Sequence, residues 1–316
     1  MRLVFLGSPS FATPVLRALL ASPHEVSGLV TPPDRPRGRG RGVPASPLAE
    51  LARERGVRTL RPKTTKDPAF VRELAGLEPE VLAVASYGEI LRRDVLDLAP
   101  HGALNVHASL LPRWRGASPI QHAILAGDEE TGVSVQRMVL ALDEGDVLLA
   151  ERTPIGSEES AGELLERLAE LGGGALVRAL DALQEGRARF LPQDSGGVTY
   201  APKLKKEDGL VDWSRSAEEL ARFVRAMTPW PGARARCPDG RELVLLRARP
   251  VSGSPGVAAG RAPAGTAIVA AGGAFLVATG RGALELQEVK PAGRAAMTGA
   301  AFLRGARLAP GERLGS

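Results

Sequence analysis

The sequence predicts an α/β protein in which an open sheet of parallel strands over residues 2–190 is followed by a small antiparallel β-barrel. Three observations support this prediction. Short apolar runs alternate with helical patterns in the first part, the hydrophobic period changes after residue 227, and glycines and prolines separate the short runs beyond it. At 316 residues the chain is also longer than one hydrophobic core usually serves, so two domains are expected.

The first part shows the alternation of strand and helix that builds an open sheet. Short apolar runs suited to buried parallel strands occupy residues 3–6, 26–30, 81–85 and 103–106. Apolar residues at three- and four-residue spacing predict helices over residues 11–20, 48–55, 70–74 and 161–183. Gly173 and Gly174 interrupt the last pattern, which leaves open whether it forms two helices or one kinked helix.

The second part begins with a helix and continues as strands. Residues 216–227 place apolar side chains on one face, and Ser216 is a candidate N-cap before Glu219. Strand-like runs follow at 241–247, 266–269, 274–278 and 283–289, and the Gly/Ala-rich residues 252–273 suggest a loose hairpin. We therefore predict an α/β domain over residues 1–190, a linker over 191–208 and a β-domain over 209–316.

Composition narrows the class of protein. The chain is 44% hydrophobic and 24% charged, as in ordinary soluble proteins, and its only cysteine is Cys237. A single cysteine excludes an internal disulfide framework and a zinc site built from several thiolates. No apolar run is long enough for a signal peptide or a membrane span. We expect a cytoplasmic protein without a membrane partner.

Charge is distributed unevenly along the chain. Residues 203–316 carry 18 Lys+Arg against 10 Asp+Glu, a net +8, whereas residues 1–202 carry 23 against 26, a net −3. A basic module attracts polyanions through counterion release, so tRNA, mRNA, DNA and anionic lipid are all admissible partners. The alternative is a GC-rich coding bias, which the chain's 35 arginines against six lysines suggest.

Polar residues cluster after the strand predicted to end at residue 106. Alternation places Asn105 and His107 on one side of that strand, at the edge of the sheet where open α/β proteins bind ligands. The turn at 142–146, with the sequence LDEGD, brings three carboxylates 36 or more residues later, and one of them could face the histidine. Singly, His107 suits a structural histidine and Asp143 a solvated turn, but together they indicate a reactive site.

Motifs for three other functions, a serine protease, a dinucleotide-binding protein and a metal hydrolase, are incomplete in this sequence. Residues 194–197 (DSGG) resemble the serine motif of trypsin-like proteases, but Gln193 replaces the preceding glycine and disulfides are impossible. The opening segment GSPSFA lacks the second and third glycines of a dinucleotide-binding loop. Only four histidines occur, without a His-Glu-x-x-His pattern, so a metal hydrolase has little support and no metal is expected.

Five motifs make the chain resemble the methionyl-tRNA formyltransferase family over essentially its full length. They are LVFLGSPSFA at 3–12, PDRPRGRG at 33–40, NVHASLLPRWRGASPIQ at 105–121, LDEGD at 142–146 and TYAPK at 199–203. Ser118 stands where alanine is common in the family. The resemblance implies a Rossmann-like formyltransferase domain followed by an OB-like β-barrel domain.

The same resemblance implies the chemistry. A formyl group is transferred from the co-substrate 10-formyltetrahydrofolate to the α-amino group of methionyl initiator tRNA, for translation initiation. The family's catalytic trio falls on Asn105, His107 and Asp143, and its folate signature on Ser109, Leu110, Leu111 and Pro112. Asn105 and His107 would stabilise an oxyanion, His107 would act as general acid, and Asp143 would orient the imidazole and favour its charged form.

Basic residues are expected to hold the tRNA. The resemblance assigns the arginine-rich loop to the acceptor stem, and the basic linker and barrel to the rest of the acceptor arm. The candidates are Arg35, Arg37, Arg39, Arg41, Lys203, Lys205, Lys206, Arg234 and Arg236. No obligate protein partner is evident from the sequence.

Two other functions compete with this interpretation. A formyltransferase acting on glycinamide ribonucleotide or an amino-sugar nucleotide would share the trio and the folate site, but has no evident use for the +8 module. A noncatalytic RNA-binding protein on a degenerate enzyme scaffold would not need Asn105, His107 and Asp143 intact.

Overall fold

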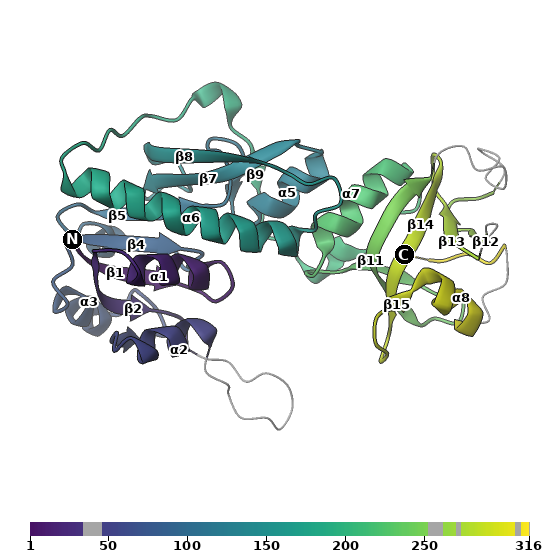
Figure 1. The fold of residues 1–316 in the computed structure, drawn as a ribbon, viewed down its shortest axis with the longest axis horizontal. Helices are drawn as coiled ribbons and strands as arrows, with labels where there is room; N and C mark the ends of the chain where they lie inside the picture. The colour runs from purple at the N-terminus through teal and green to yellow at the C-terminus, as the bar shows by residue number, and fades with distance from the viewer. Residues whose placement is uncertain (34–45, 252–261, 270–272, 307–310, 316) are drawn as a thin grey trace. The chain divides into compact units, whose positions relative to one another are not determined.

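The computed structural model describes residues 1–33, 46–251, 262–269, 273–306 and 311–315 (Figure 1). The chain forms two compact units, the first comprising residues 1–119, 130–154 and 165–201, and the second residues 120–129, 155–164 and 202–316. The predicted linker 191–208 is thus divided between the units after residue 201. In the described ranges, no helix combines the length and apolar character that crossing a membrane requires.

A seven-stranded sheet forms the centre of the first unit, in the order β3-β2-β1-β4-β5-β7-β8. The first five strands are parallel, and two antiparallel strands extend the sheet beyond β5. The strands are β1 (Arg2–Gly7), β2 (Glu25–Val30), β3 (Thr59–Leu60), β4 (Val81–Ala85), β5 (Ala103–His107), β7 (Glu130–Arg137) and β8 (Val147–Pro154). This confirms the Rossmann-like open sheet, to which β7 and β8 are an unpredicted addition.

Helices cover both faces of this sheet. One face carries α1 (Ala12–Leu20) and α6 (Ala161–Gln184), and the other carries α3 (Pro68–Ala75) and α4 (Arg93–Leu96), as Figure 1 and the core contacts show. β4 is buried along its whole length between them. This explains why the parallel strands read as continuous apolar runs rather than as alternating ones. The remaining helix of this region, α2 (Pro47–Glu54), lies beside α1.

The glycines in α6 allow close packing rather than breaking the helix. α6 is one continuous 24-residue helix, which settles the alternative left open by Gly173 and Gly174. A Cβ on Gly173 would lie 2.8 Å from the Cβ of Ala18, and one on Gly172 would lie 2.7 Å from Cγ1 of Val106. These glycines therefore let α6 approach both α1 and the strand that carries the predicted catalytic residues.

The second unit contains a curled antiparallel sheet, in the order β10-β11-β14-β13-β12 with β15 added to β14. The strands are β10 (Ala233–Arg236), β11 (Glu242–Val251), β12 (Ala267–Val269), β13 (Phe275–Ala278), β14 (Ala283–Pro291) and β15 (Met297–Thr298). The unit also contains α5 (Pro119–Ala126), α7 (Ala217–Met227) and α8 (Gly299–Ala306). The expected cap is present, because Ser216 Oγ accepts from Glu219 N at 3.2 Å while Ser216 N donates to Glu219 Oε2 at 2.9 Å.

The C-terminal segment connects the two edges of this sheet. Gly315 and Arg236 of β10 exchange backbone hydrogen bonds of 2.8 and 3.0 Å, and the amide of Ala267 in β12 donates to the Glu312 carbonyl at 2.7 Å. The segment thereby bridges β10 and β12, the pairing that a small barrel needs to remove its exposed edges. Most of the predicted hairpin at 252–273 lies outside the described residues.

His24 is a buried histidine whose charge state links stability to pH. Its Nε2 lies 3.2 Å from Asp181 Oδ1, and its Nδ1 lies 3.3 Å from the Met1 amino group. Burial and then the charge of that amino group lower the pKa of His24, against the opposing effect of Asp181. The folded state therefore binds fewer protons than the unfolded state below pH about 6.5, where a free histidine titrates.

We expect the free energy of unfolding to decrease as the pH falls below about 6.5, and His24→Gln to remove this part of the decrease. Urea denaturation midpoints measured between pH 7.5 and 5 test the prediction. His101→Gln, at an exposed position of the same unit, serves as the control. An unchanged pH dependence in His24→Gln would refute it.

Candidate active site

β5 delivers the two predicted catalytic side chains to one face of the sheet. Val106 lies against Gly172 of α6, so Asn105 and His107, its neighbours in the strand, point to the opposite face. In the antiparallel pairing with β7, Asn105 lies opposite Gln136 and His107 lies opposite Ser134. The period-2 prediction is therefore correct, and it brings two further polar residues of β7 to the same place.

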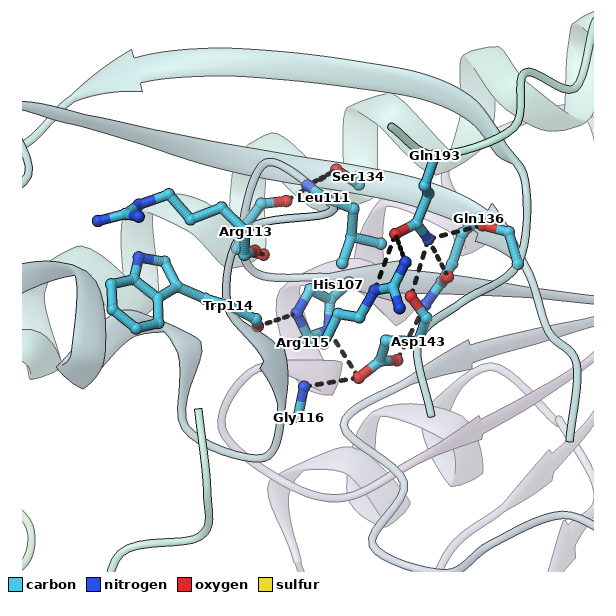
Figure 2. Close-up of polar contacts among 12 residues, drawn as sticks. His107, Leu111, Arg113, Trp114, Arg115, Gly116, Ser134, Gln136, Asp143 and Gln193 are labelled. Atoms are coloured by element: carbon cyan, nitrogen blue, oxygen red, sulfur yellow. Dashed lines mark hydrogen bonds and ion pairs between the residues drawn. The ribbon is translucent and has the colours of Figure 1, made fainter. Parts of the chain in front are cut away.

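His107 is held at the carboxyl end of β5 by a backbone acceptor. The residue is 6% exposed, and its Nε2 lies 2.8 Å from the Trp114 carbonyl oxygen. Because a carbonyl only accepts, Nε2 carries a hydrogen, which leaves Nδ1 directed at Asp143. Trp114 presents this carbonyl from a left-handed conformation with φ 62°, while Figure 2 shows its ring and the Arg113 side chain extending away from His107.

Asp143 lies beside the imidazole with both carboxylate oxygens anchored. Its Oδ2 is 3.7 Å from His107 Nδ1, an ion-pair distance that is longer than a hydrogen bond. The same oxygen accepts from the Gly116 amide at 2.9 Å, and Oδ1 accepts from Gln136 Nε2 at 2.9 Å (Figure 2). The carboxylate is thus fixed by the chain segment that follows His107 and by β7, and it faces the imidazole.

The three carboxylates of the turn have different surroundings. Asp143 faces His107, Glu144 accepts from buried Arg115 at 3.0 Å, and Asp146 is exposed. Asp143 adopts φ 51°, and a Cβ on Gly145 would lie 1.6 Å from the Arg137 carbonyl oxygen. A side chain at Gly145 would collide with β7, so the turn lies directly against the strand and directs Asp143 inward.

Asn105 is the one member of the trio whose side chain forms no hydrogen bond or ion pair to a described residue. It is half-buried, and its amide forms no hydrogen bond to any residue in the described part of the chain. A half-buried amide without a partner is available to a ligand. The structure therefore brings His107 and Asp143 into contact and places Asn105 on the same face, two residues earlier in β5.

The predicted folate signature forms the turn after β5. Ser109 is fully buried, its Oγ donates to the Arg113 carbonyl at 2.6 Å, and its own carbonyl accepts from Ser134 Oγ at 2.8 Å. The Leu111 amide donates to Ser134 Oγ at 3.0 Å. The Ser109 hydroxyl is therefore used to shape the turn, while Leu110, Leu111 and Pro112 are half-buried.

The predicted tRNA contacts fall into three groups. Arg35, Arg37, Arg39 and Arg41 lie outside the described residues. Lys203, Lys205, Lys206 and Arg236 are exposed. Arg234 is 8% exposed, donates to the Lys206 carbonyl and lies 3.4 Å from Glu242. Its guanidinium stabilises the second unit internally.

Sequence reasoning missed Gln136, Gln193 and Arg115, which contact Asp143 or its turn. It also missed Ser134, which holds the turn after β5. Ser134 and Gln136 alternate with buried Val133 and Val135, so a period-2 reading of residues 130–137 could have found them. Gln193 has no local signal, because its partners lie 48 to 78 residues away in the sequence. Among the described residues, no group of three His, Cys, Asp or Glu side chains could hold a metal ion.

The described fold resembles those of two proteins of known structure, one of which is a sugar formyltransferase. HypX from Aquifex aeolicus in complex with tetrahydrofolic acid superposes with a TM-score of 0.66 at 19% identity, covering 96% of this chain and 47% of that one. The sugar 3N-formyltransferase WlaRD, in the presence of dTDP and 5-N-formyl-THF, superposes with a TM-score of 0.65 at 12% identity. The superposition covers 93% of this chain and 99% of that one. At these identities the likeness concerns the fold alone.

Sequence comparison is more specific. Residues 1–180 match the formyl transferase family model, and residues 203–307 match the model of the formyl transferase C-terminal domain. The methionyl-tRNA formyltransferase of Parvibaculum lavamentivorans is 45% identical to this chain, and the alignment covers 99% of each sequence. That of Acidiphilium cryptum is also 45% identical, and the alignment covers the whole of each sequence, 100%. That of Moorella thermoacetica is 42% identical, covering 100% of this chain and 99% of its own. The chain belongs to the methionyl-tRNA formyltransferase family.

Proposed function

We propose that the chain transfers the formyl group of 10-formyltetrahydrofolate to the α-amino group of methionyl initiator tRNA, giving N-formylmethionyl-tRNA. The observation that carries this proposal is identity of 42 to 45% with methionyl-tRNA formyltransferases across both units. The pairing of His107 with Asp143 beside an unengaged Asn105 supports it, because acyl transfer to an amine needs donors and a proton carrier, and no metal.

Asn105 is suited to stabilising negative charge. When bound, 10-formyltetrahydrofolate supplies the formyl group, and its fit here depends on a hydrogen-bond donor aimed at the carbonyl oxygen. The Asn105 amide can supply this donor, because it is half-buried and makes no hydrogen bond within the described residues. Preorganised donors of this kind stabilise developing negative charge without reorganisation, and removing one typically costs about 10²- to 10³-fold in kcat.

His107 and Asp143 form the proton-handling pair. Nε2 of His107 carries a hydrogen that the Trp114 carbonyl accepts, and Nδ1 faces the Asp143 carboxylate. A bound substrate that replaces the Trp114 carbonyl would receive this hydrogen bond, with Asp143 stabilising the charged imidazole. We assign general acid catalysis to His107, and its orientation to Asp143.

Folate binding is assigned to the turn formed by Ser109, Leu110, Leu111 and Pro112. The Ser109 hydroxyl is occupied by the Arg113 carbonyl, so its contribution is to hold the shape of the turn rather than to contact the co-substrate. Leu110, Leu111 and Pro112 remain half-buried and can present apolar surface next to His107. Ligand sites of this kind are lined mainly by apolar groups with a few placed polar ones.

The second unit is proposed to bind the tRNA. We retain the division into a catalytic domain over 1–190, a linker over 191–208 and a tRNA-binding domain over 209–316, and we propose a cytoplasmic location. Lys203, Lys205, Lys206 and Arg236 are exposed on a region whose net charge is +8 over residues 203–316. Exposed cations at this density attract a phosphate backbone.

A direct assay tests the function. The protein is incubated with 10-formyltetrahydrofolate and either methionyl initiator tRNA, glycinamide ribonucleotide or an amino-sugar nucleotide, and the formylated product is quantified by mass spectrometry. We expect formylation of the methionyl-tRNA alone. Formylation of either small substrate without formylation of the tRNA would assign the chain to a different reaction.

Affinity for tRNA is expected to fall as salt rises, with log K decreasing by about 0.7 to 0.9 for each phosphate neutralised per tenfold increase in salt. A variant that combines Lys203→Ala, Lys205→Ala and Lys206→Ala should bind tRNA more weakly. Its plot of log K against the logarithm of salt concentration should be shallower by about 0.7 to 0.9 for each of these lysines that contacts a phosphate. Fluorescence titration at several salt concentrations measures both quantities.

Lys63→Ala provides the matched control, because Lys63 is an exposed lysine of the first unit. Its slope should equal that of the unsubstituted protein. A triple variant with the original slope would show that these lysines make no phosphate contacts.

A further inference from the structure

The segment 191–201, which lies within the proposed linker, contacts the residues that surround the candidate active site. Leu191 exchanges backbone hydrogen bonds of 2.8 and 2.9 Å with Val147, just after the carboxylate turn. Thr199 Oγ1 accepts from the Trp114 amide at 2.8 Å, and the Thr199 carbonyl accepts from the Arg115 amide at 2.9 Å. The segment therefore contacts both chain regions that surround His107.

A short parallel pairing extends these contacts. Strand β9 (Tyr200–Ala201) pairs with β6 (Arg115–Gly116), the strand whose Gly116 amide donates to Asp143 at 2.9 Å. The Ala201 carbonyl also accepts from the Ser118 amide at 3.1 Å. The backbone that presents a donor to Asp143 is thus itself held in place by the segment 191–201.

Gln193 is the side chain through which the segment reaches the carboxylate turn. Its Nε2 donates to the Asp143 carbonyl at 2.8 Å and to the Gly145 carbonyl at 2.7 Å (Figure 2). Its Oε1 accepts from Arg115 Nε at 3.0 Å and from Nη2 at 2.8 Å. Carbonyl oxygens cannot donate and a guanidinium cannot accept, so these partners fix the orientation of the amide.

The turn needs such support from outside. Asp143 is a non-glycine residue in the left-handed region, a strained conformation that persists only when surrounding contacts impose it. Arg115, 7% exposed, joins Gln193 to Glu144 of the same turn. Gln193 therefore holds the backbone carbonyls of Asp143 and Gly145, while Arg115 holds both Gln193 and the Glu144 side chain.

We propose that Gln193 is a positioning residue for formyl transfer, which acts by holding Asp143 against His107. The segment 191–201, the first part of the proposed linker, then helps to shape the catalytic site. This inference rests on the proposed function, because it assigns Gln193 a role only through Asp143. Gln193 itself donates to backbone carbonyls and contacts no reacting atom.

A double-mutant cycle tests this assignment. Gln193→Ala should lower kcat for methionyl-tRNA formylation by about 10- to 100-fold, the order that a displacement of about 1 Å costs, with KM for both substrates within about twofold. In an Asp143→Asn background, the same substitution should change single-turnover rates by less than about twofold. A residue with a purely structural role would lower the rate equally in both backgrounds.

Gln193→Glu distinguishes the acceptor role of the Gln193 side chain, toward Arg115, from its donor role, toward the carboxylate turn. Glutamate retains an acceptor for Arg115, so the fold is supported, but it loses both donors to the turn. We expect the same fall in kcat as for Gln193→Ala, in a protein that circular dichroism shows to be still folded. Gln184→Ala, at an exposed glutamine of the same unit, is the matched control and should keep full activity.

Two results would overturn the inference while the proposed function stands. The first is a kcat within about twofold of the unsubstituted protein in both Gln193 variants. The second is a Gln193→Ala substitution that lowers the single-turnover rate by the same factor in the original protein and in the Asp143→Asn background. An unsubstituted protein that fails to formylate methionyl-tRNA refutes the proposed function instead. The two failures are therefore distinguishable in one set of assays.

Discussion

Replacing His107 with alanine is expected to lower kcat for formyl transfer by about 10²- to 10⁴-fold, the range that a positioned general acid contributes. The reason is geometric. His107 lies at the carboxyl end of β5, with Nε2 bearing a hydrogen and Nδ1 facing Asp143 at 3.7 Å, and no other histidine takes part in this pair. Single-turnover formylation with excess enzyme measures the residual rate.

The variant should remain folded. Loss of the imidazole leaves the Trp114 carbonyl without its donor, which costs about 1 to 3 kcal/mol, against a typical domain stability of about 5 to 15 kcal/mol. Circular dichroism and thermal melting check this expectation. His101→Ala, at an exposed histidine of the same unit, should retain full activity. A His107→Ala protein with half or more of the original kcat would refute the role of the imidazole.

Asp143→Asn is the second substitution expected to have a large effect, lowering kcat by about 10²-fold or more. Both carboxylate oxygens accept hydrogen bonds, one from the Gly116 amide and one from Gln136 Nε2, each at 2.9 Å. An asparagine has a single acceptor oxygen, so in either orientation its NH₂ group faces another donor. The side chain must move away from His107, and the negative charge beside the imidazole is lost.

Asp146→Asn is the matched control for this prediction. Asp146 is an exposed carboxylate of the same turn, three residues from Asp143, so the substitution changes the net charge equally without changing the site. Steady-state kinetics should show kcat unchanged for Asp146→Asn and reduced for Asp143→Asn. Equal activities in the two variants would mean that the carboxylate facing His107 has no part in the reaction.

The elements that the sequence predicted well are those in which local pattern and tertiary environment agree. β1, β4 and β5 are buried over nearly their whole length, and β2 over its last three residues, so their burial appears directly as apolar runs. The capping box of α7 was predictable because both partners, Ser216 and Glu219, belong to one helical turn. Where the structure extends the prediction, in β7 and β8, the strands carry polar residues that weaken the apolar signal.

The candidate site was predictable in part for the same reason. Asn105 and His107 share a strand, so strand alternation alone places them on one face. The resemblance to the family singled out Asp143 among three carboxylates, and the structure places that residue beside the imidazole. The accessibility of Arg234 was not predictable, because its burial depends on a contact with Lys206, 28 residues earlier in the chain.

By itself the sequence determined the parallel sheet, the strand that carries Asn105 and His107, the charge of the C-terminal region and the family. The tertiary structure decided which groups support Asp143. Gln136, Arg115 and Gln193 come from three separate segments, and Gln193 lies 50 residues from the turn that it holds. The periodicity of apolar residues and the composition of a segment indicate only which residues are neighbours within one helix or strand. The partners of a buried hydrogen-bonding group are instead those that the folded chain brings within about 3 Å, whatever their distance in sequence.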